Sequence, residues 1–187
     1  MKAIGTAFYM LGRGLDRVLS ATQLIAVILL GLMMLHVVFD VGLRYVTLRG
    51  LPATVEIVSN YYMVGLAFLP LAFAEKRNGH IVVEVLTQNL PMRGQRFTLV
   101  LTWLLSAVVF ALLAHRGFID AEKHRATGNF VFSQGLRLPI WPCYYFIPVG
   151  FGLLTLALVY RSIATVLGLR DGVGFEDPLT SQRQVET

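Results

Sequence analysis

Residues 19–46, LSATQLIAVILLGLMMLHVVFDVGLRYV, form an apolar run that is long enough to cross a lipid bilayer as a helix. About 20 consecutive apolar residues suffice for one crossing. Three further runs follow, at residues 53–74, 97–115 and 138–167. We therefore predict an all-α integral membrane protein with four transmembrane helices, whose membrane domain covers residues 1–170.

The composition supports this class. Of 187 residues, 56% are apolar and 14% are charged, whereas soluble domains have about 25% charged residues. The formal net charge is +5, but the Lys and Arg residues flank the apolar runs and form no single basic stripe, so nucleic acid is not a predicted partner. Because Cys143 is the only cysteine, an internal disulfide and a CxxC metal site are both excluded.

Three segments outside or between the four runs carry further predictions. HIVVEVLTQNLPMRGQRF, residues 80–97, places its apolar side chains largely on one helical face, which predicts an amphipathic helix on the membrane surface between the second and third spans. The stretch before residue 19 is interrupted by charged residues, so we interpret it as a retained, partly amphipathic helix and not as a cleaved signal peptide. Residues 171–187 are polar and are predicted to form a cytoplasmic tail.

Basic residues between the spans predict the orientation. Ten of the sixteen Lys and Arg residues fall on the side that carries both termini, and six fall on the other side. Because cytoplasmic loops of membrane proteins are enriched in Lys and Arg, we predict that both termini lie in the cytoplasm. Trp103 and Trp141 suit the aromatic belts at the two membrane surfaces.

Ionisable side chains within apolar runs are costly and usually have a partner or a task. Asp40 and Arg44 are four residues apart in the first run, which places them on one helical face and predicts an ion pair. Glu56, near the same end of the second run, is the alternative partner of Arg44. We interpret the three residues as a clasp between helices. A proton or ion path is the competing hypothesis, but the third and fourth runs offer only groups such as Thr102 and Thr155 to continue it.

No catalytic signature is present, and the sequence predicts neither an enzyme nor a cofactor. HExxH, GxSxG and Gly-rich phosphate loops are all missing from the 187 residues. Two alternative functions remain open. In a haem-binding redox subunit, facing histidines would hold the haem, but His80 and His124 fall in loops on opposite sides of the membrane. A small self-assembling channel would need a polar face along a whole helix.

Three stretches resemble one known family. They are FDVGLRYVTLRGLPATVEI (residues 39–57), AFAEKRNGHIVVEVL (residues 72–86) and the Ile-Pro-x-Gly-Phe segment at residues 147–151. Their order and spacing are similar to those of the small membrane subunit (DctQ-type small permease) of tripartite ATP-independent periplasmic (TRAP) transporters. One departure is that the family often has paired acidic residues at the start of the second span, where this chain has only Glu56.

The resemblance implies a multi-pass subunit of the bacterial inner membrane with two protein partners. One is a large TRAP membrane subunit that holds the substrate and sodium sites, and the other is a periplasmic substrate-binding protein that delivers organic acids. The small subunit would act as a scaffold for sodium-coupled uptake by the large one. This sequence agrees, because it shows no internal repeat and no broken helix of the kind that binds substrate at the membrane midplane.

Five further residues receive roles from this hypothesis. Arg77 and His80 are expected to fix the turn after the second span, where Gly79 supplies a backbone angle that other residues resist. Lys123 and Arg125, in the charged segment of residues 116–139, are expected to dock the binding protein electrostatically.

Overall fold

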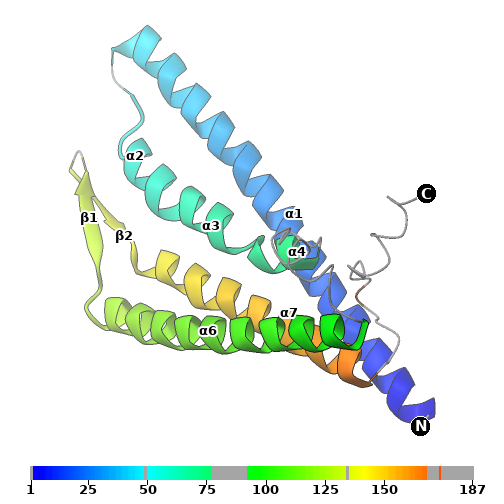
Figure 1. Ribbon diagram of the computed structural model, residues 1–187. Helices are drawn as coiled ribbons and strands as arrows, with labels where there is room; N and C mark the ends of the chain where they lie inside the picture. The colour runs from blue at the N-terminus through cyan, green and yellow to red at the C-terminus, as the bar shows by residue number, and fades with distance from the viewer. Residues whose placement is uncertain (1, 49, 77–91, 134, 168–172, 174–187) are drawn as a thin grey trace. The chain divides into compact units, whose positions relative to one another are not determined.

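The computed structural model of the chain describes residues 2–48, 50–76, 92–133, 135–167 and 173. Within them, four helices are long and apolar enough to cross a membrane, which confirms the predicted fold class (Figure 1). These spans are Phe8–Thr47, Thr54–Lys76, Phe97–Ala126 and Trp141–Leu167. Residues 80–91 of the predicted surface helix and residues 174–187 of the predicted tail lie outside the described residues.

Helix α1, Lys2–Thr47, is one uninterrupted helix of 46 residues. At 1.5 Å per residue it is roughly 69 Å long, about twice the thickness of a bilayer's hydrocarbon core. The retained N-terminal helix that the sequence predicts is therefore the first part of the same helix as the first span.

The second span is a helix with two irregularities. It consists of α2 (Thr54–Ile57), the π-helix η1 (Val58–Tyr62), α3 (Met63–Phe68) and α4 (Leu71–Lys76). Pro70, which has no backbone N–H, falls in the interruption between α3 and α4. No sequence signal indicated the π-helix, and residues Thr54 to Lys76 still form one span.

The third span belongs to helix α6, Met92–Ala126, which continues eleven residues beyond the predicted end at His115. Residues after His115 include Arg116, Asp120 and Glu122, whose charges do not suit a hydrocarbon environment. Hydropathy marked only the apolar part of this helix, because the charged residues that follow His115 lower the hydropathy without ending the helix.

A β-hairpin, which the sequence did not predict, separates the third and fourth spans. Strand β1 (Phe130–Ser133) pairs antiparallel with strand β2 (Leu136–Pro139). The fourth span was predicted from residue 138, but residues 138 and 139 belong to β2. The span instead begins with the 3-10 helix η3 (Trp141–Tyr145) and continues as α7 (Phe146–Leu167).

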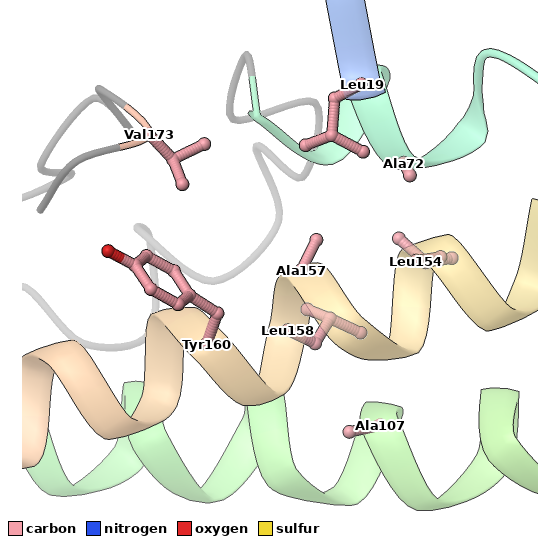
Figure 2. Close-up of a cluster of buried hydrophobic side chains, with 8 residues drawn as sticks. All are labelled: Leu19, Ala72, Ala107, Leu154, Ala157, Leu158, Tyr160 and Val173. Carbon is pink, nitrogen blue, oxygen red and sulfur yellow. The ribbon is translucent and has the colours of Figure 1, made fainter. Parts of the chain in front are cut away.

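The chain divides into two compact units, and each is described by itself. Unit 1 comprises the described parts of residues 1–21, 71–111 and 152–187. Its hydrophobic core gathers side chains of α1, α4, α6 and α7 together with one residue near the C-terminus (Figure 2). The core residues are Leu19, Ala72, Ala107, Leu154, Ala157, Leu158, Tyr160 and Val173.

Unit 2 comprises the described parts of residues 22–70 and 112–151. In it, α1 buries only a narrow face, whose positions recur at alternating spacings of four and three residues, as at the seam of a coiled coil. Apart from the adjacent Gln23, these positions are Thr22, Ala26, Leu29, Met33, His36, Asp40 and Leu43. The remaining surface of α1 exposes large apolar side chains such as Leu24, Met34 and Phe39, which suits contact with lipid.

Gly150 marks a close approach between two helices of unit 2. A Cβ atom at this position would collide with the backbone carbonyl group of Phe68, at the end of α3 beside the break. The rings of Phe68 and Phe151 pack edge to face, with their centroids 5.3 Å apart. The glycine of the Ile-Pro-x-Gly-Phe segment therefore has a packing reason, because only glycine leaves room for this backbone.

Candidate functional site

A buried ion pair lies in unit 1 between the second and fourth spans. Nη1 of Arg161, on α7, donates a hydrogen bond to Oε1 of Glu75, on α4, over 3.1 Å. Both residues are buried, with exposed fractions of 4% for Glu75 and 5% for Arg161. Two charges removed from solvent stabilise each other only when they are paired. This pair therefore fixes how α4 and α7 pack.

Trp103 of α6 contacts the same pair. The guanidinium carbon of Arg161 lies 4.3 Å from the centroid of the Trp103 ring, which is a cation–π geometry. The sequence assigned Trp103 to an aromatic belt at the membrane surface. In the structure its ring packs on the guanidinium group of Arg161, so α6 joins α4 and α7 at this cluster.

The neighbouring residue of α4 connects to α1. Nζ of Lys76 forms an ion pair with the carboxylate of Asp16, and both side chains are partly exposed. Successive residues of α4, Glu75 and Lys76, therefore pair with two different helices of unit 1. We call Asp16, Glu75, Lys76, Arg161 and Trp103 the four-helix polar cluster.

None of the four charged residues of this cluster was among the site residues predicted from the sequence. A signal was available, because Glu75 and Arg161 adjoin or interrupt apolar runs, where a charge needs a partner. Their separation of 86 residues carries no periodicity, however, so the sequence alone could not pair them.

Asp40, in unit 2, makes two contacts near the end of α1. Its Oδ2 accepts a hydrogen bond from Nε of Arg44 over 2.9 Å, and its Oδ1 accepts one from the backbone N–H of Leu51 over 2.6 Å. Leu48 and Ala53, in the same connection, have positive φ angles of 58° and 62°. The buried carboxylate of Asp40 thus holds the turn that leads from the first span into the second.

Glu56 is not brought into this arrangement. Its backbone carbonyl accepts a hydrogen bond from Nδ2 of Asn60 over 2.9 Å. Within the part of the chain that the structure describes, no ion pair joins its carboxylate to Arg44. Of the three residues that the clasp hypothesis grouped, the structure brings only Asp40 and Arg44 together.

The two cations expected to dock a partner lie at the C-terminal end of α6. Nη2 of Arg125 pairs with Oε1 of Glu122 at 2.5 Å, and the hydroxyl of Tyr145 donates to Oε2 of the same carboxylate over 2.9 Å. Lys123 is exposed. Arg77, Gly79 and His80 lie outside the described residues, so the expected turn after the second span has no structural description.

Histidines of unit 2 pack against aromatic rings. The His36 and Tyr62 ring centroids are 5.9 Å apart in an edge-to-face arrangement, and His124 stacks on Tyr144 with centroids 3.9 Å apart. Among the described residues, no group of three or more His, Cys, Asp or Glu side chains is placed to hold a metal ion.

Comparison with known proteins places this architecture in a family. The family model described as "Tripartite ATP-independent periplasmic transporters, DctQ component" matches residues 33–168. A protein of Haemophilus influenzae named "Putative TRAP transporter small permease protein" is 31% identical over 148 residues, which cover 79% of this chain and 88% of that protein. The family model matches well over half of the chain. It covers the last part of the first span and the whole of the other three. The chain therefore belongs to the DctQ family and is a multi-pass small permease component of tripartite ATP-independent periplasmic transporters.

Proposed function

We propose that this small permease is a scaffold that holds the large membrane subunit of its transporter in place during transport. The supporting observation is that four acidic side chains of this chain form ion pairs with its own Lys and Arg residues. Asp16, Asp40, Glu75 and Glu122 each pair with a cation of this chain. The Asp16–Lys76 and Glu75–Arg161 pairs join different helices and set their positions, which a scaffold needs.

Substrate choice and energy coupling belong, in this proposal, to the other components. The large membrane subunit would hold organic acid and sodium, and a periplasmic substrate-binding protein would deliver the acid. The small permease would contact both without binding substrate. As a transporter component, it is not an enzyme.

We further propose that the protein lies in the bacterial inner membrane with both termini in the cytoplasm, as the Lys and Arg distribution favours. The β-hairpin and the Asp40 turn would then face the periplasm. Single cysteines introduced at exposed Phe132 and at Arg13, in a Cys143→Ser background, test this orientation with a membrane-impermeant thiol reagent. Labelling of intact spheroplasts at position 132 and not at 13 is expected, and the reverse pattern would contradict the orientation.

Lys123 and Arg125 are proposed to attract an acidic face of the binding protein. Reversing both charges with Lys123→Glu and Arg125→Glu should raise the binding-protein concentration that half-saturates transport, because steering between opposite charges is lost. The shift should shrink as salt is added, since salt screens exposed charges. Unchanged half-saturation at low salt would count against this contact.

The scaffold role is tested by tagging this chain in native membranes, solubilising in mild detergent and identifying co-purifying proteins by mass spectrometry. A large multi-span partner in equal amount is expected. A chain that purifies alone or only with itself would refute the scaffold proposal. Loss of the partner in a Glu75→Ala variant that still inserts in the membrane would link the four-helix polar cluster to assembly.

A further inference from the structure

One face of helix α1 changes from cationic to apolar along its length. Arg13 and Arg17 are four residues apart, so their side chains share a face. Leu24 and Ile28 follow Arg17 after about two and three turns at 3.6 residues per turn, which places them on the same face. All four side chains are exposed, Leu24 at 61% and Ile28 at 53%. This face therefore presents two guanidinium groups and then a row of apolar side chains.

The opposite face of α1 packs against the protein. Leu15 and Leu19 lie two residues to either side of Arg17, which is about 200° around the helix. Leu19 is fully buried in the hydrophobic core of unit 1, and Leu15 packs against that core. Arg13 and Arg17 therefore point away from the core of unit 1.

Neither guanidinium group is neutralised within the part of the chain that the structure describes. Asp16 is the only acidic residue among residues 1–39, and its carboxylate pairs with Lys76. The other ion pairs of the described residues likewise leave out Arg13 and Arg17. The face thus carries two positive charges that need an anion from outside the chain.

The level of these charges on α1 matches a lipid headgroup. From Arg17 to Leu24 the helix rises roughly 10 Å at 1.5 Å per residue, and the polar layer of a bilayer extends about 5–8 Å beyond the hydrocarbon on each side. Arg side chains are long enough to span the difference, because their stems lie along apolar surface while the guanidinium group reaches the interface. Cations directly followed by an apolar face complement a phosphate joined to acyl chains.

We propose that Arg13 and Arg17 bind the phosphate of an anionic phospholipid whose acyl chains lie along Leu24 and Ile28. We call these four residues the lipid face. Guanidinium groups suit this task, because their planar N–H donors match phosphate oxygens in pairs. The inference does not depend on the scaffold role. It holds for either orientation of the chain, since it requires only that α1 crosses a bilayer.

The test uses the full-length chain, purified in detergent and equilibrated with equal amounts of phosphatidylglycerol and phosphatidylcholine. Native mass spectrometry measures the ratio of the two lipids that stay bound. The variants are Arg13→Gln, Arg17→Gln, both together, and the double change to Lys. The matched control, Lys123→Gln with Arg125→Gln, removes the same two charges from the end of α6. Circular dichroism confirms that each variant is folded, and co-purification of the large subunit from native membranes is measured in parallel.

The parent should prefer phosphatidylglycerol, and each single Gln variant should lower that preference about fivefold, the usual contribution of one basic residue near an anionic membrane. The double Gln variant should bind the two lipids nearly alike. The double Lys variant should keep most of the preference, because it keeps the charge and loses only the planar donor group. The control should change the preference less than twofold.

A double Gln variant that prefers phosphatidylglycerol as strongly as the parent does would overturn the lipid face. A double Gln variant with unchanged lipid preference that no longer retains the large subunit would assign the face to that protein, which also overturns the inference. Failure of the parent chain to co-purify with any large subunit would instead refute the scaffold proposal and leave the lipid face standing.

Discussion

The two units of this small permease hold their helices together in different ways. In unit 1 a buried ion pair between Glu75 and Arg161, covered by Trp103, joins helices that are far apart in the sequence. In unit 2 the buried carboxylate of Asp40 makes local contacts with the turn that follows it. The close helix crossing there depends on a missing side chain, that of Gly150.

The difference indicates which kind of substitution each unit tolerates least. A buried ion pair is intolerant of the loss of one partner, because the other charge then stays buried without compensation. A backbone crossing at glycine is intolerant of added volume. In a turn held by a carboxylate, water can replace the lost hydrogen bonds. This contact is therefore expected to be the most tolerant of substitution among the three.

The largest effect is expected from breaking the buried pair. Glu75→Ala or Arg161→Ala should destabilise the protein by about 3–5 kcal/mol, the usual cost of leaving one buried charge without its partner. Thermal unfolding in detergent, followed by intrinsic tryptophan fluorescence, measures the loss. Trp103, one of the two tryptophans of the chain, covers the pair, so part of the emission reports on the site.

A double variant serves as the control for this prediction. Glu75→Leu with Arg161→Met removes both charges and keeps apolar volume, so it should recover most of the stability that either single change loses. A single variant that unfolds no earlier than the double variant would show that charge pairing is not what fixes α4 against α7.

The helix crossing of unit 2 gives the second largest effect. Gly150→Ala should destabilise by about 1–3 kcal/mol, because the added methyl group meets backbone atoms of Phe68 that cannot rotate away. Gly152→Ala, two residues further along α7, is the matched control, since a Cβ there meets nothing within 4 Å. The same unfolding assay compares the two. Equal melting temperatures would mean that the crossing is loose enough to absorb a methyl group.

Elements that depend on composition and short spacing could be predicted from the sequence, whereas contacts that depend on distant pairing could not. The four spans followed from apolar runs, and the Asp40–Arg44 contact followed from a spacing of four residues. The Glu75–Arg161 pair could not, because nothing local connects the two residues. The last two residues of the strand Leu136–Pro139 were included in the predicted fourth span, since Leu138 continues the apolar composition of that span.

The Asp40 turn should show a smaller effect than either contact above. Asp40→Ala removes the acceptor for the Leu51 N–H and the partner of Arg44, whereas Asp40→Asn keeps one acceptor oxygen and should retain more stability. Glu56→Gln should leave the melting temperature unchanged, because in the described structure its carboxylate is not joined to Arg44. A drop in melting temperature in Glu56→Gln as large as that in Asp40→Ala would instead support the hypothesis that Glu56 joins Asp40 and Arg44 in one clasp.

The smallest effect is expected at the partly exposed pair of the four-helix polar cluster. Lys76→Gln or Asp16→Asn should cost only about 0.2–1 kcal/mol, because solvent screens both charges and replaces the lost contact. The cost should fall further in high salt, whereas the cost of Glu75→Ala should not, since the Glu75–Arg161 pair is out of reach of ions. Measuring the unfolding of both variants at low and high salt therefore distinguishes the partly exposed contact of Lys76 from the buried contact of Glu75. A shared salt dependence would show that water reaches the Glu75–Arg161 pair, and the contrast between a buried and a solvated contact in unit 1 would no longer hold.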